Sequence, residues 1–320
     1  TITPDGRYVA FVSAASDLVE GDTNGIPDVF IRDLQTGATT LVSAQARTGY
    51  GGSASSSDSP AMTPDGRFVA FTSTASNLVP GSPTLYQEVY VCDLALGQTI
   101  WVSTNVTTAS PRISYSPVLS DDGRFVAFKT SAADKFLVLR RDLQSAALDV
   151  ISTNAAGFEP PWGDVYGPEM SSDGRHVAFS GASTTANTSS IWLWDGQTKT
   201  TFLVSANLLG QPSADGLCDA PALTPDGRFV AFVSSGTDLV TNEVNGEFQV
   251  YVRDMQSGVT KLVTPDSNGV AFGNAEGAVP VLTPDGRFVL FDSRSDAFVG
   301  DDQNDAYDVF VRDTAAETTE

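Results

Sequence analysis

The apolar residues of the chain occur in short runs in which large side chains alternate with smaller or polar ones. Residues 67–73 show this clearly, with the period-2 pattern of a half-buried β-strand. A Thr-Pro-Asp-Gly turn at 63–66 joins them to a short predicted strand at 59–62. Two more strands are predicted at 88–93 and 100–103. No segment keeps a helical period for more than one turn, so the pattern predicts an all-β chain.

The same pattern returns six times along the sequence. The string Thr-Pro-Asp-Gly-Arg-aromatic-Val-Ala-Phe, or a close variant, places its central aspartate at Asp5, Asp65, Asp122, Asp173, Asp226 and Asp285. These aspartates are 60, 57, 51, 53 and 59 residues apart, a spacing typical of propellers and β-solenoids. Four strands per unit favour a six-bladed β-propeller with four antiparallel strands per blade. We expect one domain over residues 1–320, with repeats starting near residues 3, 63, 120, 171, 224 and 283.

The first and last units are shorter than the others. The first inner strand is reduced to Thr1-Ile2, and the last outer strand is reduced to residues 318–320. A closed propeller needs both of these strands. We therefore expect incomplete blades at the chain ends, in a fragment or a trimmed chain.

The connections between the predicted strands are of two kinds. The turns between the first and second strands and between the third and fourth are short, and they share one face because strand direction alternates. The other connections are long and share the opposite face, and their sequences differ from unit to unit. Variable loops on a repeated scaffold are usual binding sites. The loops between units span about residues 44–58, 104–115, 153–166, 206–219 and 265–277.

The repeated motif resembles a known family. Thr/Ser-Pro-Asp-Gly-Arg-Phe-Val-Ala-Phe, followed by Asp-Val-Phe-Val-Arg-Asp, is similar to the PD40 (WD40-like) repeat of the TolB-type propellers, and the resemblance covers nearly the whole chain. It implies a propeller fold. Similar propellers serve as periplasmic protein-binding modules, as gating domains of prolyl-oligopeptidase-like enzymes and as parts of large secreted bacterial proteins.

The charge of the chain narrows the choice of partners. Lys and Arg number 18 against 39 Asp and Glu, which gives a net charge of −21. Such a surface repels nucleic acid and anionic membranes, and no apolar stretch reaches the length of a membrane span. Two cysteines, Cys92 and Cys218, and one histidine, His176, are too few for a Cys/His zinc site. We expect both cysteines to be free thiols and His176 to replace a packed aromatic residue.

Two loops resemble the opening of a calcium-binding loop. In the first unit, Gly25 permits a sharp bend among oxygen-bearing side chains. The last unit repeats the arrangement, and calcium is the one cofactor that we expect. The alternative is a pair of ordinary Asx turns. The predicted ligands are Asp22, Asn24, Asp28, Asp302, Asn304, Asp305 and Asp308.

Most other polar residues of the repeat are predicted to be structural. The arginine after each Asp-Gly turn, such as Arg7, is expected to pair with the aspartate that ends the third strand, such as Asp33. No Gly-x-Ser-x-Gly elbow and no sialidase box occurs, so a peptidase, esterase or sialidase is disfavoured.

The loop Glu-Pro-Pro-Trp-Gly-Asp-Val-Tyr differs from the other connections. Its prolines stiffen it, and Trp162 and Tyr166 offer rigid apolar surface for a peptide or sugar. The alternative is that Trp162 folds back over the edge of its blade. The residues predicted to bind a ligand are Trp162, Asp164, Tyr166, Arg47 and Arg112.

These observations favour a non-catalytic propeller that binds a protein or peptide through its long loops and channel mouth. One alternative is a hydrolase or lyase that uses carboxylates or a metal, and another is a structural repeat module of a larger surface protein. Low lysine content and strong acidity suggest a periplasmic or extracellular location. We expect a monomer that binds no nucleic acid and inserts into no membrane.

Overall fold

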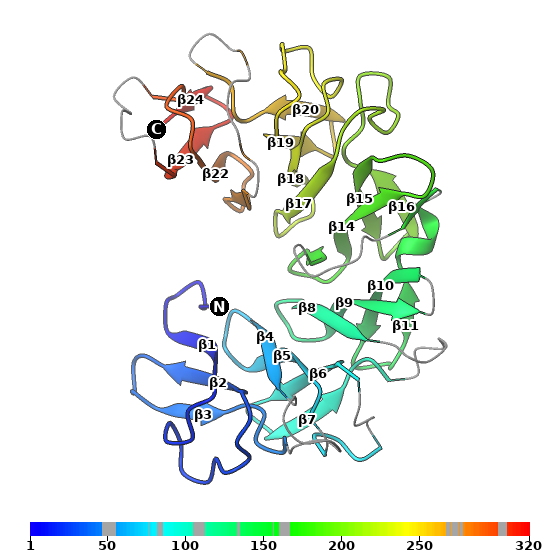
Figure 1. The fold of residues 1–320 in the computed structure, drawn as a ribbon. Coiled ribbons are helices and arrows are strands. Elements are labelled where there is room, and N and C mark those ends of the chain that lie inside the picture. The colour runs from blue at the N-terminus through cyan, green and yellow to red at the C-terminus, as the bar shows by residue number, and fades with distance from the viewer. Residues whose placement is uncertain are drawn as a thin grey trace. The chain divides into compact units, whose positions relative to one another are not determined.

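The computed structural model describes residues 1–46, 56–75, 77–81, 86–104, 113–132, 135–155, 157–159, 167–266, 270, 275, 278–299 and 306–320. The chain divides into two compact units, Thr1–Val150 and Ile151–Glu320. Each unit consists of antiparallel sheets whose strands follow one another along the chain (Figure 1). Among the described residues the single helical element is a 3-10 turn, η1 (Ser152–Asn154), and no helix there is long and apolar enough to cross a membrane.

The first unit contains three sheets, coloured blue to green in Figure 1. The first sheet consists of β1 (Tyr8–Ser13), β2 (Asp28–Asp33) and β3 (Thr39–Leu41), and Ile2 adds an isolated bridge to Val9. The second consists of β4 (Ser57–Met62), β5 (Phe68–Ser73), β6 (Glu88–Asp93) and β7 (Gln98–Trp101). The third consists of β8 (Ser114–Leu119), β9 (Phe125–Ala132), β10 (Lys135–Asp142) and β11 (Leu148–Val150).

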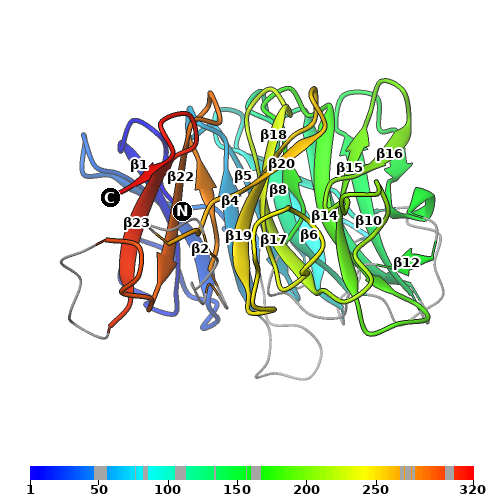
Figure 2. The same ribbon diagram turned by 90° about the horizontal axis from the view of Figure 1, so that it is seen from above.

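The second unit contains the other three sheets. The fourth sheet consists of β12 (Phe158–Glu159), β13 (Glu169–Met170), β14 (His176–Ser183), β15 (Ser189–Asp195) and β16 (Thr200–Leu203). The fifth consists of β17 (Cys218–Leu223), β18 (Phe229–Ser234), β19 (Gln249–Asp254) and β20 (Val259–Leu262), which Figure 2 shows from a second direction. The sixth consists of β21 (Val281–Leu282), β22 (Phe288–Ser293), β23 (Asp308–Asp313) and β24 (Thr318–Thr319).

The predicted strands agree with the observed ones except at their ends. In the second sheet the last strand was expected at 100–103, whereas β7 covers Gln98–Trp101. The backbone leaves the ladder there because Ser103 uses its side chain, and its Oγ accepts the N–H of Val89 at 3.0 Å. The prediction of an all-β chain is thus confirmed, and among the described residues four of the six antiparallel sheets have the predicted four strands. The closure of six blades into one ring stays a prediction.

Apolar side chains on facing sheets form the core within each unit. Between the first and second sheets, Val29 and Ile31 pack with Val69 and Phe71. In the second unit, Tyr251 and other fifth-sheet residues pack with the fourth sheet. Such side chains supply most of the favourable free energy of folding, roughly 25 cal/mol per Å² of buried apolar surface.

A ring-on-glycine contact also joins neighbouring sheets. At four joints within the two units, the residue after the Asp-Gly-Arg turn of one sheet lies against the turn glycine of the next. These contacts are Tyr8 on Gly66, Phe68 on Gly123, His176 on Gly227 and Phe229 on Gly286. A Cβ atom on Gly123, for example, would lie 2.2 Å from the Phe68 ring. Glycine is therefore needed there for space as well as for its positive φ of 70°. His176 fills the same place against Gly227, which agrees with its predicted packing role.

Candidate functional site

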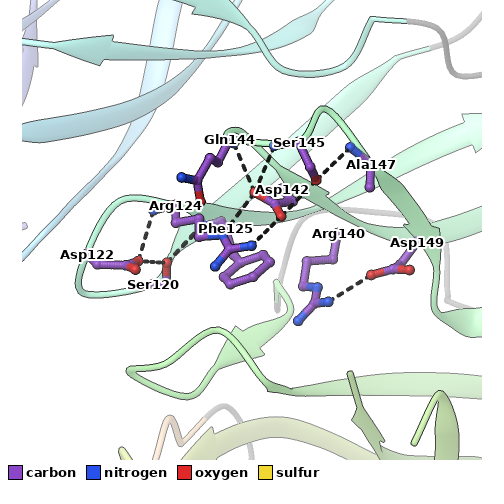
Figure 3. A network of polar contacts seen from close by, with 10 residues as sticks. All are labelled: Ser120, Asp122, Arg124, Phe125, Arg140, Asp142, Gln144, Ser145, Ala147 and Asp149. Carbon is purple, nitrogen blue, oxygen red and sulfur yellow. Dashed lines mark hydrogen bonds and ion pairs between the residues drawn. The ribbon is translucent and has the colours of Figure 1, made fainter. Parts of the chain in front are cut away.

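At one end of each sheet, which we call the short-turn end, tight turns join the strands and a polar network repeats with the motif. In the third sheet, Asp122 Oδ1 accepts hydrogen bonds from the Ser120 hydroxyl at 2.6 Å and the Arg124 N–H at 2.9 Å (Figure 3). The Arg124 guanidinium donates to both carboxylate oxygens of Asp142, at 3.1 and 2.7 Å. Asp142 also accepts two backbone N–H groups of the following turn. The Asp142 carboxylate thus holds the turn that follows β10 directly, and it holds the turn that contains Asp122 through Arg124.

All six sheets contain this Arg–Asp pair, as the sequence predicted. In each pair the arginine holds the pKa of the aspartate below its usual range, because it donates hydrogen bonds to the charged form. Each charge therefore has its partner within its own sheet, which assigns the motif residues to the fold. The pairs, with N···O distances of 2.6–2.9 Å, are Arg7–Asp33, Arg67–Asp93, Arg124–Asp142, Arg175–Asp195, Arg228–Asp254 and Arg287–Asp313.

A second arginine in the third sheet also has an acidic partner. Arg140 lies over the ring of Phe125, with its guanidinium carbon 4.4 Å from the ring centre, and its Nη2 donates to Asp149 at 2.8 Å (Figure 3). The two residues face each other across β10 and β11. In the fifth sheet the arginine lies one strand position later, at Arg253, and it faces Thr260.

The first predicted calcium loop adopts an Asx turn. Asn24 Oδ1 accepts the N–H of Ile26 at 3.1 Å, and Asn24 Nδ2 donates to Asp28 Oδ2 at 2.7 Å. Asp28 is buried, and its other oxygen accepts a short hydrogen bond from Ser43. Within the described ranges, no three His, Cys, Asp or Glu side chains form a group that could hold a metal ion. Calcium at Asp22, Asn24 and Asp28 stays a prediction.

The position of Asp28 is a repeated structural one. In the second sheet Glu88 accepts a short hydrogen bond from Ser103, and in the fifth Gln249 Oε1 accepts one from the Thr264 hydroxyl at 2.7 Å. Asp308 begins β23 at the equivalent place, and its Oδ2 is buried without a hydrogen-bond partner among the described residues. The side chain that begins the third strand thus tethers the connection after the fourth strand.

Several predicted site residues lie outside the described residues. These are the ligand-binding candidates Trp162, Asp164, Tyr166, Arg47 and Arg112 and the calcium candidates Asp302, Asn304 and Asp305. Their predicted roles stay predictions.

The reactive side chains that the structure does describe are dispersed. Cys92 and Cys218 are free and buried, as predicted, and burial raises the pKa of the Cys218 thiol to about 11. Surrounding atoms desolvate the carboxyl of Glu169 and raise its pKa to about 7, although part of this side chain is exposed. A carboxyl with such a pKa is suited to proton transfer. Catalysis by carboxylates alone would require a second acid beside it.

Two long connections of the second unit are fastened to each other. Asn207 Nδ2 donates to Asp238 Oδ2 at 2.9 Å, and the Thr237 hydroxyl donates to Asp215 Oδ2 at 2.5 Å. A Cβ atom on Gly216 would lie 2.5 Å from the Gly236 backbone. The loop after β16 and the loop after β18 are therefore held together in one arrangement.

These loops and the start of β20 line an open cavity of about 470 Å³. Leu208, Leu239 and Val240 supply apolar wall, and Arg253 is the single charged residue that lines the cavity. A second cavity of about 210 Å³ lies on the other side of the strand and is lined in part by Lys261. Both volumes are those of small-molecule or side-chain sites rather than of a whole protein partner.

The edge strand β20 separates the two cavities. It is the last strand of the fifth sheet, and Thr260 lines both cavities. Val263 donates its N–H to Val250 O at 2.8 Å. Because backbone groups alternate in an antiparallel pair, those of Thr260 and Leu262 turn away from β19. They have no backbone partner among the described residues, so β20 offers an open edge.

Arg253 differs from the arginines of the short-turn network. Its Nη1 donates to the Thr260 hydroxyl at 2.7 Å, and its Nε is buried without a partner among the described residues. Burial lowers the pKa of Arg253, and no carboxylate offsets that effect. In a chain of charge −21, a half-buried arginine without an acidic partner is a local excess of positive charge.

Sequence reasoning placed binding in the long loops but did not identify this cavity. Arg253 stands at the strand position of Arg32 and Cys92, which the alignment of repeats shows. The adjacent Leu208 and Leu209, which are 60% and 84% exposed, are an apolar pair within a predicted polar loop. That pair was the signal in the sequence.

No family model matches the chain, and no curated protein matches its sequence. Solved structures resemble it at low sequence identity. TolB from Acinetobacter baumannii is 16% identical with a TM-score of 0.50, over 98% of this chain and 63% of that one. An oligogalacturonate lyase in complex with manganese is 15% identical with a TM-score of 0.56, over 100% of this chain and 74% of that one.

A third solved structure that resembles the chain is a propeller domain. The β-propeller domain of Cps50 (Swd1) from Myceliophteria thermophila is 12% identical with a TM-score of 0.51, over 100% of this chain and 84% of that one. The chain spans less than two thirds of the TolB structure. At these identities the comparisons establish the fold. The resemblance to TolB-type propellers is confirmed at that level, and the chain is a β-propeller module.

Proposed function

We propose that this propeller module is a non-catalytic binding module for an extended peptide segment of a protein partner. The observation that supports the proposal is the open edge of β20 between two cavities. A peptide strand can pair with such an edge through its main chain, while its alternate side chains enter the pockets on either side. The fastened loops favour binding because little loop ordering remains to oppose it.

The proposal places the chain in the periplasm or outside the cell, as a monomer. The strong acidity of the chain supports this location, since high net charge keeps exported domains apart in solution. Nucleic acid is not a proposed partner, because a surface of charge −21 repels phosphates. Calcium in the loops around Asp22 and Asp302 belongs to the proposal as a stabilising ion.

A displayed library of random twelve-residue peptides tests the proposal. Peptides selected on the wild-type chain should lose at least tenfold in affinity on Thr241→Trp, because Thr241 is exposed and lines the 470 Å³ cavity. Glu243→Trp is the matched control, since Glu243 is exposed in the same loop and lines neither cavity. The proposal fails if no peptide is selected, or if the selected peptides bind Thr241→Trp as tightly as the wild type.

A further inference from the structure

We call the 470 Å³ cavity and the adjoining edge of β20 the β20 cleft. One arginine in this cleft has no acidic partner among the described residues. Among the residues that line the 470 Å³ cavity, Arg253 carries the only charge, and no described Asp or Glu lines it. Its single hydrogen bond among the described residues goes to a neutral hydroxyl, that of Thr260. A guanidinium offers five N–H donors in a fork that fits a carboxylate.

The third sheet shows how an arginine at the same strand position is satisfied elsewhere in the protein. Arg141, which like Arg253 precedes the last aspartate of its strand, donates its guanidinium N–H groups to the backbone carbonyls of Val102, Ala146 and Thr104. In the fifth sheet the residue that faces Arg253 is Thr260, which supplies one hydroxyl, and a cavity lies beside the rest of the guanidinium.

We propose that Arg253 binds a carboxylate of the peptide ligand, with the adjoining apolar side chain in the pocket of Leu208, Leu239 and Val240. This inference rests on the proposed function and adds the chemical class that the cleft recognises. The carboxylate accepts hydrogen bonds from the Nη groups of Arg253, beside the Thr260 hydroxyl. The peptide backbone continues along β20 toward the second cavity, where Lys261 and Arg312 add positive charge against one acid, Glu317.

The carboxylate has two possible sources in a peptide, the C-terminus and an Asp or Glu side chain. Both offer the same planar, bidentate acceptor. Peptides from the selection are therefore compared as free acids, as C-terminal amides, and with each Asp or Glu replaced by Asn or Gln. The form whose neutralisation weakens binding identifies the source.

Arg253→Gln is the decisive variant, and Arg32→Gln is its matched control. Arg32 makes the same contact, with Nη1 donating to Thr39 at 2.8 Å, but it is exposed. Arg253→Gln should weaken carboxylate-bearing peptides roughly ten- to a hundredfold, as expected for a hydrogen-bonded charge, and should leave the neutralised peptides unchanged. Arg32→Gln should change neither. Equal losses for charged and neutralised peptides would overturn the inference and leave the peptide-binding proposal intact.

A second measurement does not depend on the selection. N-acetyl-leucine should shift the arginine Nε–H resonance of Arg253 in an NMR spectrum, whereas N-acetyl-leucinamide should not. Arg253→Lys assigns the resonance by removing it. If both probes shift it equally, or neither shifts it, the cleft does not recognise a carboxylate at Arg253.

Discussion

The two ends of each sheet differ in how their polar side chains are paired. At the short-turn end, every charge of the motif has a fixed partner in the same sheet, and the Arg–Asp pair recurs in all six sheets. The long connections share a tether to the residue that begins the third strand, but their sequences differ beyond it. Where they are described, they carry uneven features, such as the exposed Leu208 and Leu209. The cavity that these loops line also contains Arg253 of β19, and no described Asp or Glu lines it.

The difference shows where repetition stops being informative about function. A residue that recurs in every repeat and is satisfied by its own repeat contributes to folding. A residue whose charge is not neutralised within its own repeat, and which lies beside a cavity, can recognise a ligand. Changes at the short-turn end should therefore lower stability and leave peptide affinity unaltered. Changes in the β20 cleft should lower peptide affinity and leave stability unaltered.

The largest expected effect on stability is that of Gly123→Ala. A Cβ atom there would lie 2.2 Å from the Phe68 ring, at a φ of 70°. The combined strain and overpacking should lower the free energy of unfolding by about 3 kcal/mol, measured by chemical denaturation. Gly97→Ala is the control, because Gly97 has a φ of 63° and nothing within 4 Å, and it should cost about 1 kcal/mol. Equal losses would mean that the ring contact does not matter.

Asp142→Asn tests the network itself. It removes the charged acceptor of Arg124 and weakens a two-amide cap, and the cap alone is expected to contribute about 1 kcal/mol. Peptide affinity should not change. Asp17→Asn removes one charge at an exposed position and should leave the unfolding free energy unaltered. A loss of peptide binding in Asp142→Asn would break the separation of the two ends.

The same variant predicts a pH dependence. Arg124 lowers the folded-state pKa of Asp142, so its carboxylate contributes stability at every pH above the unfolded-state pKa of about 4. That contribution is lost as pH falls toward the lower folded-state pKa. The stability difference between wild type and Asp142→Asn should therefore shrink below about pH 4. A difference that stays constant down to pH 2 would contradict the assigned pairing.

Asn24→Ala examines a long connection that is part of the fold. The side chain of Asn24 closes an Asx turn and donates to the buried Asp28, so its loss should cost about 1 kcal/mol. The loss should be equal in calcium and in chelator if the turn alone needs Asn24. Asn245→Ala removes an exposed Asx contact and should cost less. A wild-type midpoint that rises with calcium, and does so only while Asn24 is present, would establish the predicted ion.

The smallest effect is expected from Ala146→Gly. Ala146 has a φ of 59° in the turn between β10 and β11, where Gly37, Gly97 and Gly258 stand in other sheets. Relief of left-handed strain should exceed the added chain entropy and raise the unfolding free energy by about 0.5 kcal/mol. Ala147→Gly, which has no positive φ to relieve, should lower it. A destabilised Ala146→Gly would show that the turn tolerates alanine without strain.

The sequence predicted those features that repeat. Strand type, turn position, the Arg7–Asp33 type of pair and the role of His176 all follow from residue types at fixed offsets. The β20 cleft could not be predicted in this way, because it depends on contacts between residues far apart in sequence, such as Asn207 with Asp238. No period in the sequence indicates which loops fasten to each other. That Arg253 faces a hydroxyl and a cavity becomes visible only when β20 is in register with β19.

The ring-on-glycine contact has a consequence for how such chains can change over evolutionary time. At the four joints where the contact is described, one repeat supplies an aromatic ring and the next supplies a glycine, and the fifth repeat supplies both through Phe229 and Gly227. Because these four joints use the same two complementary parts, a copied repeat can fit after another without new mutations at the joint. Duplication and recombination of whole repeats are therefore tolerated, whereas a crossover inside the turn separates the two parts. The loops can therefore differ between repeats as long as the aromatic ring and the turn glycine of each contact are kept.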